Sequence, residues 1–134
     1  MRTTCTVEDQ IRRALAEDPF VDITTVGRKT KLARRIEIWC HYHDGRIFLT
    51  GRPGKPHWYA NLCANSDFTF HLKKSVQRDI SAKARPITDE FERRAVFTRM
   101  QGFSNLSVLY NLINLKIDEW VRDSPLVEVV LNAE

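Results

Sequence analysis

Residues 34–50 read Arg-Arg-Ile-Glu-Ile-Trp-Cys-His-Tyr-His-Asp-Gly-Arg-Ile-Phe-Leu-Thr, and this stretch decides the class of fold. Apolar side chains alternate from Ile36 to Tyr42, which is the period of a strand with one face in a hydrophobic core. Asp44-Gly45 is a strong signal for a two-residue hairpin turn. We therefore expect Arg46–Thr50 to pair antiparallel with the strand that precedes it.

The second face of this strand is mixed in character. It carries Arg35, Glu37, Trp39, His41 and His43. We expect this face to meet a ligand or a second subunit. His41 and His43 project the same way and have the chemistry of metal ligands, but a third ligand at a suitable spacing is missing. The sequence therefore predicts no metal site, and the two histidines are expected to be exposed or at an interface.

The rest of the chain supplies further short strands and several helices. Periodicity and turn signals predict strands at Phe20–Val26, Asp67–Lys73, Gln77–Arg85 and Leu126–Leu131. They also predict one helix that begins near Val7, a second that begins near His57 or Trp58, and helical segments at Glu90–Met100 and Asn105–Val121. Mostly hairpin links between about six strands exclude a doubly wound sheet. They favour a mainly β or α+β fold, a small closed or split β-barrel with peripheral helices, in which residues 1–134 form a single domain.

Composition and charge narrow the class of protein. Of the 134 residues, 43% are apolar and 28% charged, which is typical of a globular chain. No apolar run reaches the ~20 residues that span a bilayer and no signal core follows Met1, so we expect a cytoplasmic protein without an integral membrane segment. A net charge of +4 is too small to indicate nucleic acid as a partner. Three cysteines without a C-x-x-C pair fit a reducing compartment, with Cys40 and Cys63 as buried, inert thiols.

Two stretches predict an anion site. Residues 28–35 hold five cations and no acid, and Gly51–Asn65 joins a glycine and proline turn to the start of a helix. Glycine lets a backbone approach a ligand closely, and a helix N-terminus favours a phosphate or a carboxylate. The candidates for the phosphate of a nucleotide-like cofactor are Arg28, Lys29, Thr30, Arg34, Lys55 and the backbone at Gly54, with Trp58 or Trp39 to pack on a ring. The alternative for Trp58, Tyr59 and Leu62 is the core face of a short helix.

The chain shows no other catalytic set. No serine stands in a nucleophile-elbow context, and the acids are scattered over helix faces. A protein with anion donors and aromatic rings, but without a nucleophile or an acid and base pair, is typical of one whose bound cofactor supplies the reactivity.

The two stretches resemble a known family. Gly27-Arg28-Lys29-Thr30 with Arg34, then Gly51-x-Pro-Gly-Lys-Pro and Trp58-Tyr59-Ala60-Asn61-Leu62-x-Ala-Asn65, look like the signature of the deazaflavin-dependent nitroreductases. These are split β-barrel flavin and deazaflavin oxidoreductases related in fold to pyridoxamine-phosphate oxidases. Lys31 stands where the family pattern has a second glycine.

The resemblance implies a function and assigns roles. Reduced coenzyme F420 would donate a hydride to an activated double bond, a quinone or a nitro-type acceptor. By position, Arg28, Lys29, Thr30 and Arg34 would contact the phosphate or the acidic tail of F420, and Gly54, Lys55, Trp58 and Asn61 would form the second wall. Tyr110 and His41 are candidate proton donors. The alternatives are an FMN- or other flavin-binding protein and a module that binds or stores a cofactor without catalysis, and a homodimer is expected by analogy.

Overall fold

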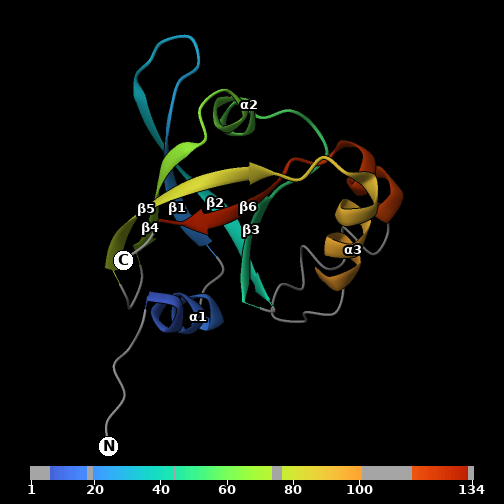
Figure 1. The fold of residues 1–134 in the computed structure, drawn as a ribbon, viewed down its shortest axis with the longest axis horizontal. Coiled ribbons are helices and arrows are strands. Elements are labelled where there is room, and N and C mark those ends of the chain that lie inside the picture. Colours follow the sequence, from blue (N-terminus) through green and yellow to red (C-terminus); the bar gives the residue numbers. More distant parts are fainter. Residues whose placement is uncertain (1–6, 18–19, 44, 74–76, 101–115, 133–134) are drawn as a thin grey trace, which may run out of the picture.

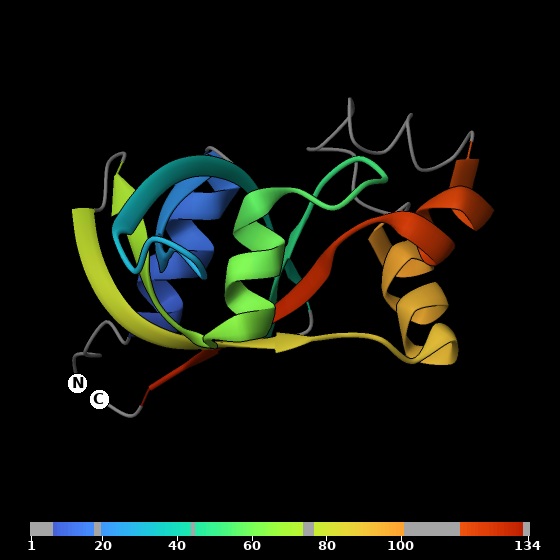
Figure 2. The ribbon, with the colours of Figure 1, turned by 90° about the horizontal axis from the view of Figure 1, so that it is seen from above.

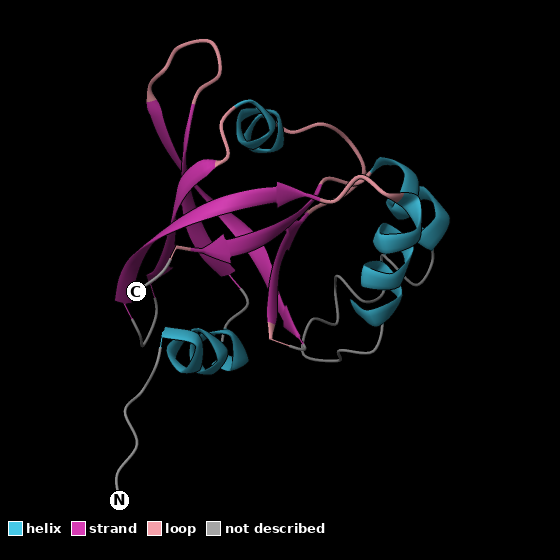
Figure 3. Ribbon diagram, viewed as in Figure 1, coloured by secondary structure: helices cyan, strands magenta, loops and turns pink. Residues whose placement is uncertain are grey.

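Six antiparallel strands close into a barrel in the computed structural model of the chain (Figure 1). The structure describes residues 7–17, 20–43, 45–73, 77–100 and 116–132. Its strands are β1 (Phe20–Val26), β2 (Ala33–His43), β3 (Arg46–Thr50), β4 (Asp67–Lys73), β5 (Gln77–Pro86) and β6 (Leu126–Leu131), and its helices are α1 (Val7–Glu17), α2 (His57–Ala64), α3 (Glu90–Met100) and a helical segment at 116–123. Figure 3 shows the helices arranged around the strands.

The order of strands around the barrel is β1-β2-β3-β6-β5-β4, and β4 pairs with β1 to close it. The hairpin predicted at Asp44-Gly45 is confirmed, since His43 pairs with Arg46 and Cys40 with Leu49, and Gly45 has a φ of 74°. The predicted small β-barrel with peripheral helices is therefore confirmed. The helical segment predicted from Asn105 is described only from residue 116 onward.

The alternation of the strands fills the barrel with apolar side chains. The buried inward residues are Val21, Ile23, Ile38, Cys40, Ile47, Leu49, Phe68, Phe70, Leu72, Ile80, Ala82, Ala84, Val127 and Val129. Helix α1 lies against the barrel, below it in Figure 1, and adds Ile11, Ala14 and Leu15 to the same cluster. Burial raises the pKa of the Cys40 thiol, which confirms this residue as a buried and unreactive cysteine. Cys63 is exposed on α2, so the prediction of a buried thiol is wrong there.

A second hydrophobic cluster lies outside the barrel, where α3 and the segment 116–123 pack against it. Its buried members are Phe48, Ile87, Val96, Phe97, Met100, Trp120, Val121 and Leu126, and Trp39 packs against them. Phe48 comes from the outward face of β3, directly opposite His41 on β2. The two helices therefore cover one side of the barrel, as Figure 2 shows from above.

This cluster buries the C-terminal half of the mixed face of β2. His41 is 3% exposed and His43 is 5% exposed, and the ring of His43 stacks on Phe48 with centroids 4.9 Å apart. The prediction of exposed histidines is wrong, because the outward face of the strand has its own apolar cover. Burial lowers the pKa of His41 to about 4, so its ring is neutral at neutral pH. In the described part of the chain, no three His, Cys, Asp or Glu residues are grouped to hold a metal ion.

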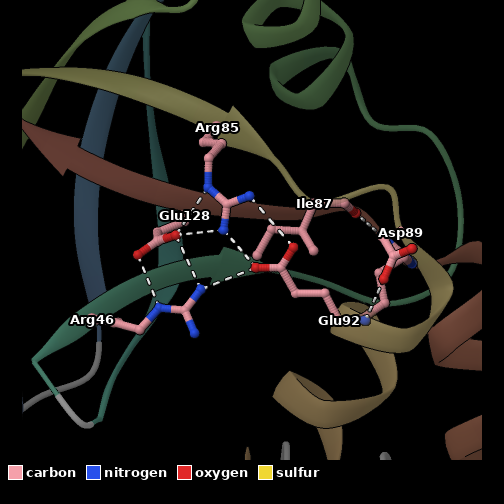
Figure 4. A network of polar contacts seen from close by, with 7 residues as sticks. Arg46, Arg85, Ile87, Asp89, Glu92 and Glu128 are labelled. Carbon is pink, nitrogen blue, oxygen red and sulfur yellow. Dashed lines mark hydrogen bonds and ion pairs between the residues drawn. The ribbon is translucent and has the colours of Figure 1, made fainter.

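A network of two arginines and two glutamates joins α3 to the barrel (Figure 4). Arg46 of β3 donates to Glu128 of β6 (Nε to Oε2, 3.0 Å) and to Glu92 of α3 (Nη2 to Oε2, 3.2 Å). Arg85 of β5 donates to the same two carboxylates, to Glu92 Oε2 at 2.6 Å and to Glu128 Oε1 at 2.7 Å. Because each carboxylate lies between two guanidinium groups, the network fixes the start of α3 against three strands.

We expect the network to contribute to stability only above acidic pH. The hydrogen bonds from Arg46 and Arg85 lower the pKa of both Glu92 and Glu128 below its ordinary value. Carboxylates with a lowered pKa stabilise the folded state above their unfolded pKa of about 4.3, and this stability is lost as pH falls through the folded pKa. Glu128→Gln should therefore lower the free energy of unfolding by about 1 kcal/mol at pH 7, a modest effect since the partners are partly exposed.

Thermal unfolding of the two proteins between pH 3 and pH 8 measures this difference. The gap in Tm between the native protein and Glu128→Gln should close below about pH 4. Glu90→Gln is the control, because within the described part of the chain the ion pair of Glu90 is an exposed contact of 4.0 Å with Arg94. A gap that stays constant down to the lowest pH would contradict the assignment.

Candidate functional site

The turn between β1 and β2 is a tight basic loop at the tip of a hairpin. Gly27 N donates to Leu32 O at 2.9 Å and Lys31 N donates to Gly27 O at 2.9 Å. Lys31 adopts a φ of 63°, the left-handed conformation that glycine takes at lower cost. The turn therefore forms with lysine at this position, at a backbone cost of about 1 kcal/mol.

Two residues of the turn fit together closely. The hydroxyl oxygen of Thr30 accepts a hydrogen bond from Leu32 N at 3.2 Å. A Cβ placed on Gly27 would lie 2.5 Å from that hydroxyl oxygen. Glycine at position 27 is thus required for Thr30 to fold back over the turn.

Asn61 of α2 holds the basic turn in place. Its carboxamide oxygen accepts hydrogen bonds from Arg28 N at 3.1 Å and from Arg28 Nη1 at 3.0 Å. Its amide nitrogen donates to the hydroxyl of Thr25 at 3.4 Å. Asn61 is only 3% exposed, so these contacts are sheltered from water. The side chain joins β1, the turn and α2 into one unit.

A cavity of about 390 Å³ opens between the turn and α2. Its described lining residues are Thr25, Gly27, Arg28, Lys29, Thr30, Arg34, Ile36, His57, Trp58 and Asn61. Helix α2 begins at His57, and no side chain of the described residues caps its N-terminus. All three charged side chains among these lining residues are cations, and Trp58 adds a flat aromatic wall. The cavity therefore has the donors that bind a phosphate or carboxylate, next to a surface that suits a ring.

The structure brings together six of the predicted cofactor residues at this cavity. They are Arg28, Lys29, Thr30, Arg34, Trp58 and Asn61. It does not bring Gly54 and Lys55 there, because both line a separate cavity on the other side of α2. Of the candidate proton donors, His41 is buried away from the lining residues, and Tyr110 lies outside the described residues.

Sequence reasoning missed three lining residues, Thr25, Ile36 and His57. The register of the barrel supplies the signal for the first two, since Thr25 pairs with Arg34 and Ile36 follows two residues later on the same face of β2. Trp58 was predicted either to pack on a cofactor ring or to belong to the core face of the helix. In the structure it packs against the barrel core and also lines the cavity.

The sequence places the chain in a family. Residues 2–111 match the profile of the family described as F420H(2)-dependent quinone reductase. The chain belongs to this family. Membership makes it an F420-dependent reductase, and it confirms the resemblance of the two motifs to deazaflavin-dependent enzymes.

Several solved structures have the same fold as this member of the F420H(2)-dependent quinone reductase family. A conserved hypothetical protein from Mycobacterium tuberculosis has a TM-score of 0.70 at 15% identity, over 98% of this chain and 87% of the other. A protein related to general stress protein 26, of the pyridoxinephosphate oxidase family, from Clostridium acetobutylicum has a TM-score of 0.68 at 11% identity, over 96% and 86%. A structure described as F420-H2 dependent reductase (FDR-A) has a TM-score of 0.55 at 19% identity, over 84% and 94%.

These identities are low, so the structures show the shared fold, the split barrel of the pyridoxamine-phosphate oxidase type. No curated protein sequence matches the chain. None of the described helices is long and apolar enough to cross a lipid bilayer.

Proposed function

We propose that this F420-dependent reductase transfers a hydride from reduced F420 to an activated double bond, a quinone or a nitro-type acceptor. One observation carries the proposal: the cavity between the basic turn and α2, in a chain of the F420H(2)-dependent quinone reductase family. Its charged lining residues are cations, and it is walled by the indole of Trp58.

The lining residues fit the chemistry of the cofactor. Arg28, Lys29 and Arg34 supply positive charge for the phosphate and for the glutamate carboxylates of the F420 tail. The hydroxyl oxygen of Thr30 accepts a hydrogen bond from Leu32 N, so the hydroxyl proton can still be donated to a ligand. Trp58 offers an apolar face to a planar ring. Asn61 acts through Arg28, whose guanidinium it orients, so we assign it as a positioning residue.

When bound, reduced F420 supplies the hydride. The protein's part in the reaction is to hold two rings face to face and to exclude water, and such positioning is worth several kcal/mol, up to about 7–11 in favourable cases. Solvent is the simplest source of the proton, since His41 is buried, has a pKa lowered to about 4 and does not line the cavity. Tyr110 as a proton donor, a homodimer and a cytoplasmic location stay predictions.

Binding and turnover separate this function from its alternatives. Reduced F420 and FMN are titrated in parallel into the protein while tryptophan fluorescence is followed, with Trp58 as the reporter that lines the cavity. Oxidation of reduced F420 is then measured with menadione and with 4-nitrobenzoate as acceptors. Binding of F420 with turnover supports the proposal, binding without turnover on either acceptor favours a storage module, and binding of FMN alone favours a flavin protein. Failure to bind either cofactor would rule out the proposal.

Arg34→Ala is expected to raise the Kd for reduced F420 at least tenfold. A hydrogen bond to a charged group contributes about 1.5–3 kcal/mol, and Arg34 lines the cavity on the same face as Thr25. Arg13→Ala is the control, because Arg13 is an exposed residue of α1. The fluorescence titration gives both constants, and equal effects of the two substitutions would remove the anion-site assignment.

A further inference from the structure

The β1–β2 hairpin extends past the closed part of the barrel. Residues 22–24 of β1 pair with β4 and residues 40–43 of β2 pair with β3, whereas residues 25–26 and 33–34 pair only with each other. Figures 1 and 3 show this end of the hairpin standing out from the barrel next to α2. Every residue from 29 to 35 is exposed. Residues 27–35, the hairpin tip, are therefore accessible to a large partner.

An apolar side chain lies among the cations of the hairpin tip. Leu32 is 65% exposed and belongs to neither hydrophobic cluster of the described residues. Lys29, Lys31 and Arg34 flank it in the sequence, and they form no ion pair within the described part of the chain. Lys31 Nζ donates to Arg28 O at 3.3 Å in an exposed contact. The tip thus presents a leucine together with uncompensated positive charge.

The cavity between the basic turn and α2 does not account for two of these residues. Neither Lys31 nor Leu32 is among its described lining residues. Lys31 also has a φ of 63°, a conformation that glycine adopts at lower cost. Backbone strain that persists in a well-formed turn is a reason to look for a role of the side chain. Lys31 and Leu32 therefore offer a surface that is separate from the cavity.

The sequence around the hairpin tip carries no acid. The tip, the loop before α2 and α2 itself, residues 27–35 and 51–65, contain none of the 17 acidic residues of the chain. They contain seven of its 21 lysines and arginines, namely Arg28, Lys29, Lys31, Arg34, Arg35, Arg52 and Lys55. The acids nearest to the tip in sequence, Asp22 and Glu37, both pair with Lys73. A surface of one sign attracts an anionic partner over a distance of about 8–10 Å in physiological salt.

We propose that the hairpin tip docks on the surface of a bilayer that contains anionic lipids. Leu32 enters the apolar side of the interface, and Lys31 beside it contacts the lipid phosphates. The other cations of the tip add attraction to the negative surface potential. The fixed turn presents both side chains in one shape, so little order has to be gained on docking.

Nucleic acid is the other common polyanion, and the leucine favours the bilayer over it. A nucleic acid is bound chiefly through its phosphates, which offer no apolar environment to an exposed Leu32. A bilayer interface offers phosphates and acyl chains within a few ångströms of each other. Docking needs no cofactor. Its consequence for the reaction rests on the function proposed above: an acceptor dissolved in the bilayer would lie close to the cavity that the same turn lines.

Co-sedimentation with vesicles tests the docking. One set of vesicles contains phosphatidylcholine alone, and the other contains phosphatidylcholine and phosphatidylglycerol in a ratio of about 7 to 3. The native protein should bind the anionic vesicles at least tenfold more tightly than the neutral ones. Raising the salt concentration from about 0.1 M to about 0.5 M should weaken this binding.

Two substitutions test the residues of the tip. Leu32→Ser should weaken binding to anionic vesicles about tenfold, because an apolar side chain no longer enters the interface. Lys31→Gly should weaken it about fivefold, since one cation is lost near the surface. Glycine relieves the strain at this position, so Lys31→Gly keeps the fold and its thermal stability should not fall. Both variants should bind F420 within about twofold of the native protein, because neither side chain lines the cavity.

Matched controls lie elsewhere on the molecule. Phe91 of α3 is 88% exposed, and the side chain of Arg12 on α1 is 62% exposed. Phe91→Ser and Arg12→Gln should bind anionic vesicles like the native protein. Insertion is read directly with acyl chains that carry bromine, which should quench the added fluorescence of Leu32→Trp and not that of Phe91→Trp.

Three results would overturn the docking proposal. They are equal binding to neutral and anionic vesicles, native affinity in Leu32→Ser, and tighter binding of a short DNA duplex than of the anionic vesicles. A protein that docks on vesicles but does not bind F420 would contradict the proposed function and leave the docking surface standing. A protein that binds F420 but not the vesicles would do the reverse.

Discussion

Arg93→Met is expected to lower the free energy of unfolding by about 3–5 kcal/mol. Arg93 is 7% exposed on α3, and its guanidinium donates to Val121 O at 2.6 Å, to Ile87 O at 2.8 Å, to Trp120 O at 3.2 Å and to Ser124 O. Methionine fills much of the same volume but removes the guanidinium donor from the buried carbonyls of Ile87, Val121 and Ser124, whereas Trp120 O keeps the hydrogen bond from Ser124 N at 3.0 Å. The end of the segment 116–123 would thereby lose its link to α3.

Denaturant unfolding measures the loss from the shift in midpoint. Arg94→Met is the matched control on the same helix, because the side chain of Arg94 is 44% exposed and its ion-pair partners among the described residues are two exposed acids, Asp118 at 2.9 Å and Glu90 at 4.0 Å. Its cost should stay below about 1 kcal/mol. A cost for Arg93→Met as small as that of the control would show that the carbonyls find other donors.

Asn61→Leu is expected to weaken the binding of reduced F420 about a hundredfold. Leucine has a similar size but accepts no hydrogen bond, so Arg28 loses the acceptor of both its backbone N–H and its guanidinium. A charged and a neutral hydrogen bond together are worth about 2–4 kcal/mol, which corresponds to this change in Kd. The basic turn would then no longer be held against α2.

Asn61→Asp separates positioning from folding. Aspartate restores the acceptor for Arg28, so the stability of the fold should be kept. It also places a negative charge in the wall of the cavity, so the binding of reduced F420 should still be weaker than in the native protein. Asn65→Leu is the control, because among the described residues the side chain of Asn65 accepts one exposed hydrogen bond, from Asp67 N at 3.1 Å, and its backbone bond to Asn61 O is kept in the variant. Fluorescence titration gives the three constants, and native affinity in Asn61→Leu would exclude the positioning role.

The barrel was predictable because its information is local. Alternation along each strand and the Asp44-Gly45 turn define the hairpin. The pairs that close the ring, β1 with β4 and β3 with β6, are distant in sequence and carry no such local signal. The second hydrophobic cluster was missed because Trp39, His41 and His43 alternate with a core face and so resemble a solvent or ligand face. Only the packing of distant helices on β2 shows that this face is covered.

The candidate site was predictable in part. A run of cations after Gly27 indicates an anion site by itself, but the contact of Arg28 with Asn61, 33 positions away, has no local signal. From the sequence we predicted that Lys55 and Trp58 line the same cavity, because they are only three positions apart. Neighbouring positions on a helix point about 100° apart, so Trp58 and Tyr59 face different cavities, and Lys55 belongs with the second.

Closure of the barrel limits how copies of this chain can associate. Each of the six described strands has a hydrogen-bonded neighbour on both sides, although the pairing does not run along every strand: Ala33–Trp39 of β2 pair only with β1, and Gln77–Ile80 of β5 pair only with β4. An open edge is the usual template for strand addition and for fibril growth. The closed part of the ladder offers no such template, so strand addition there requires that the ring first open.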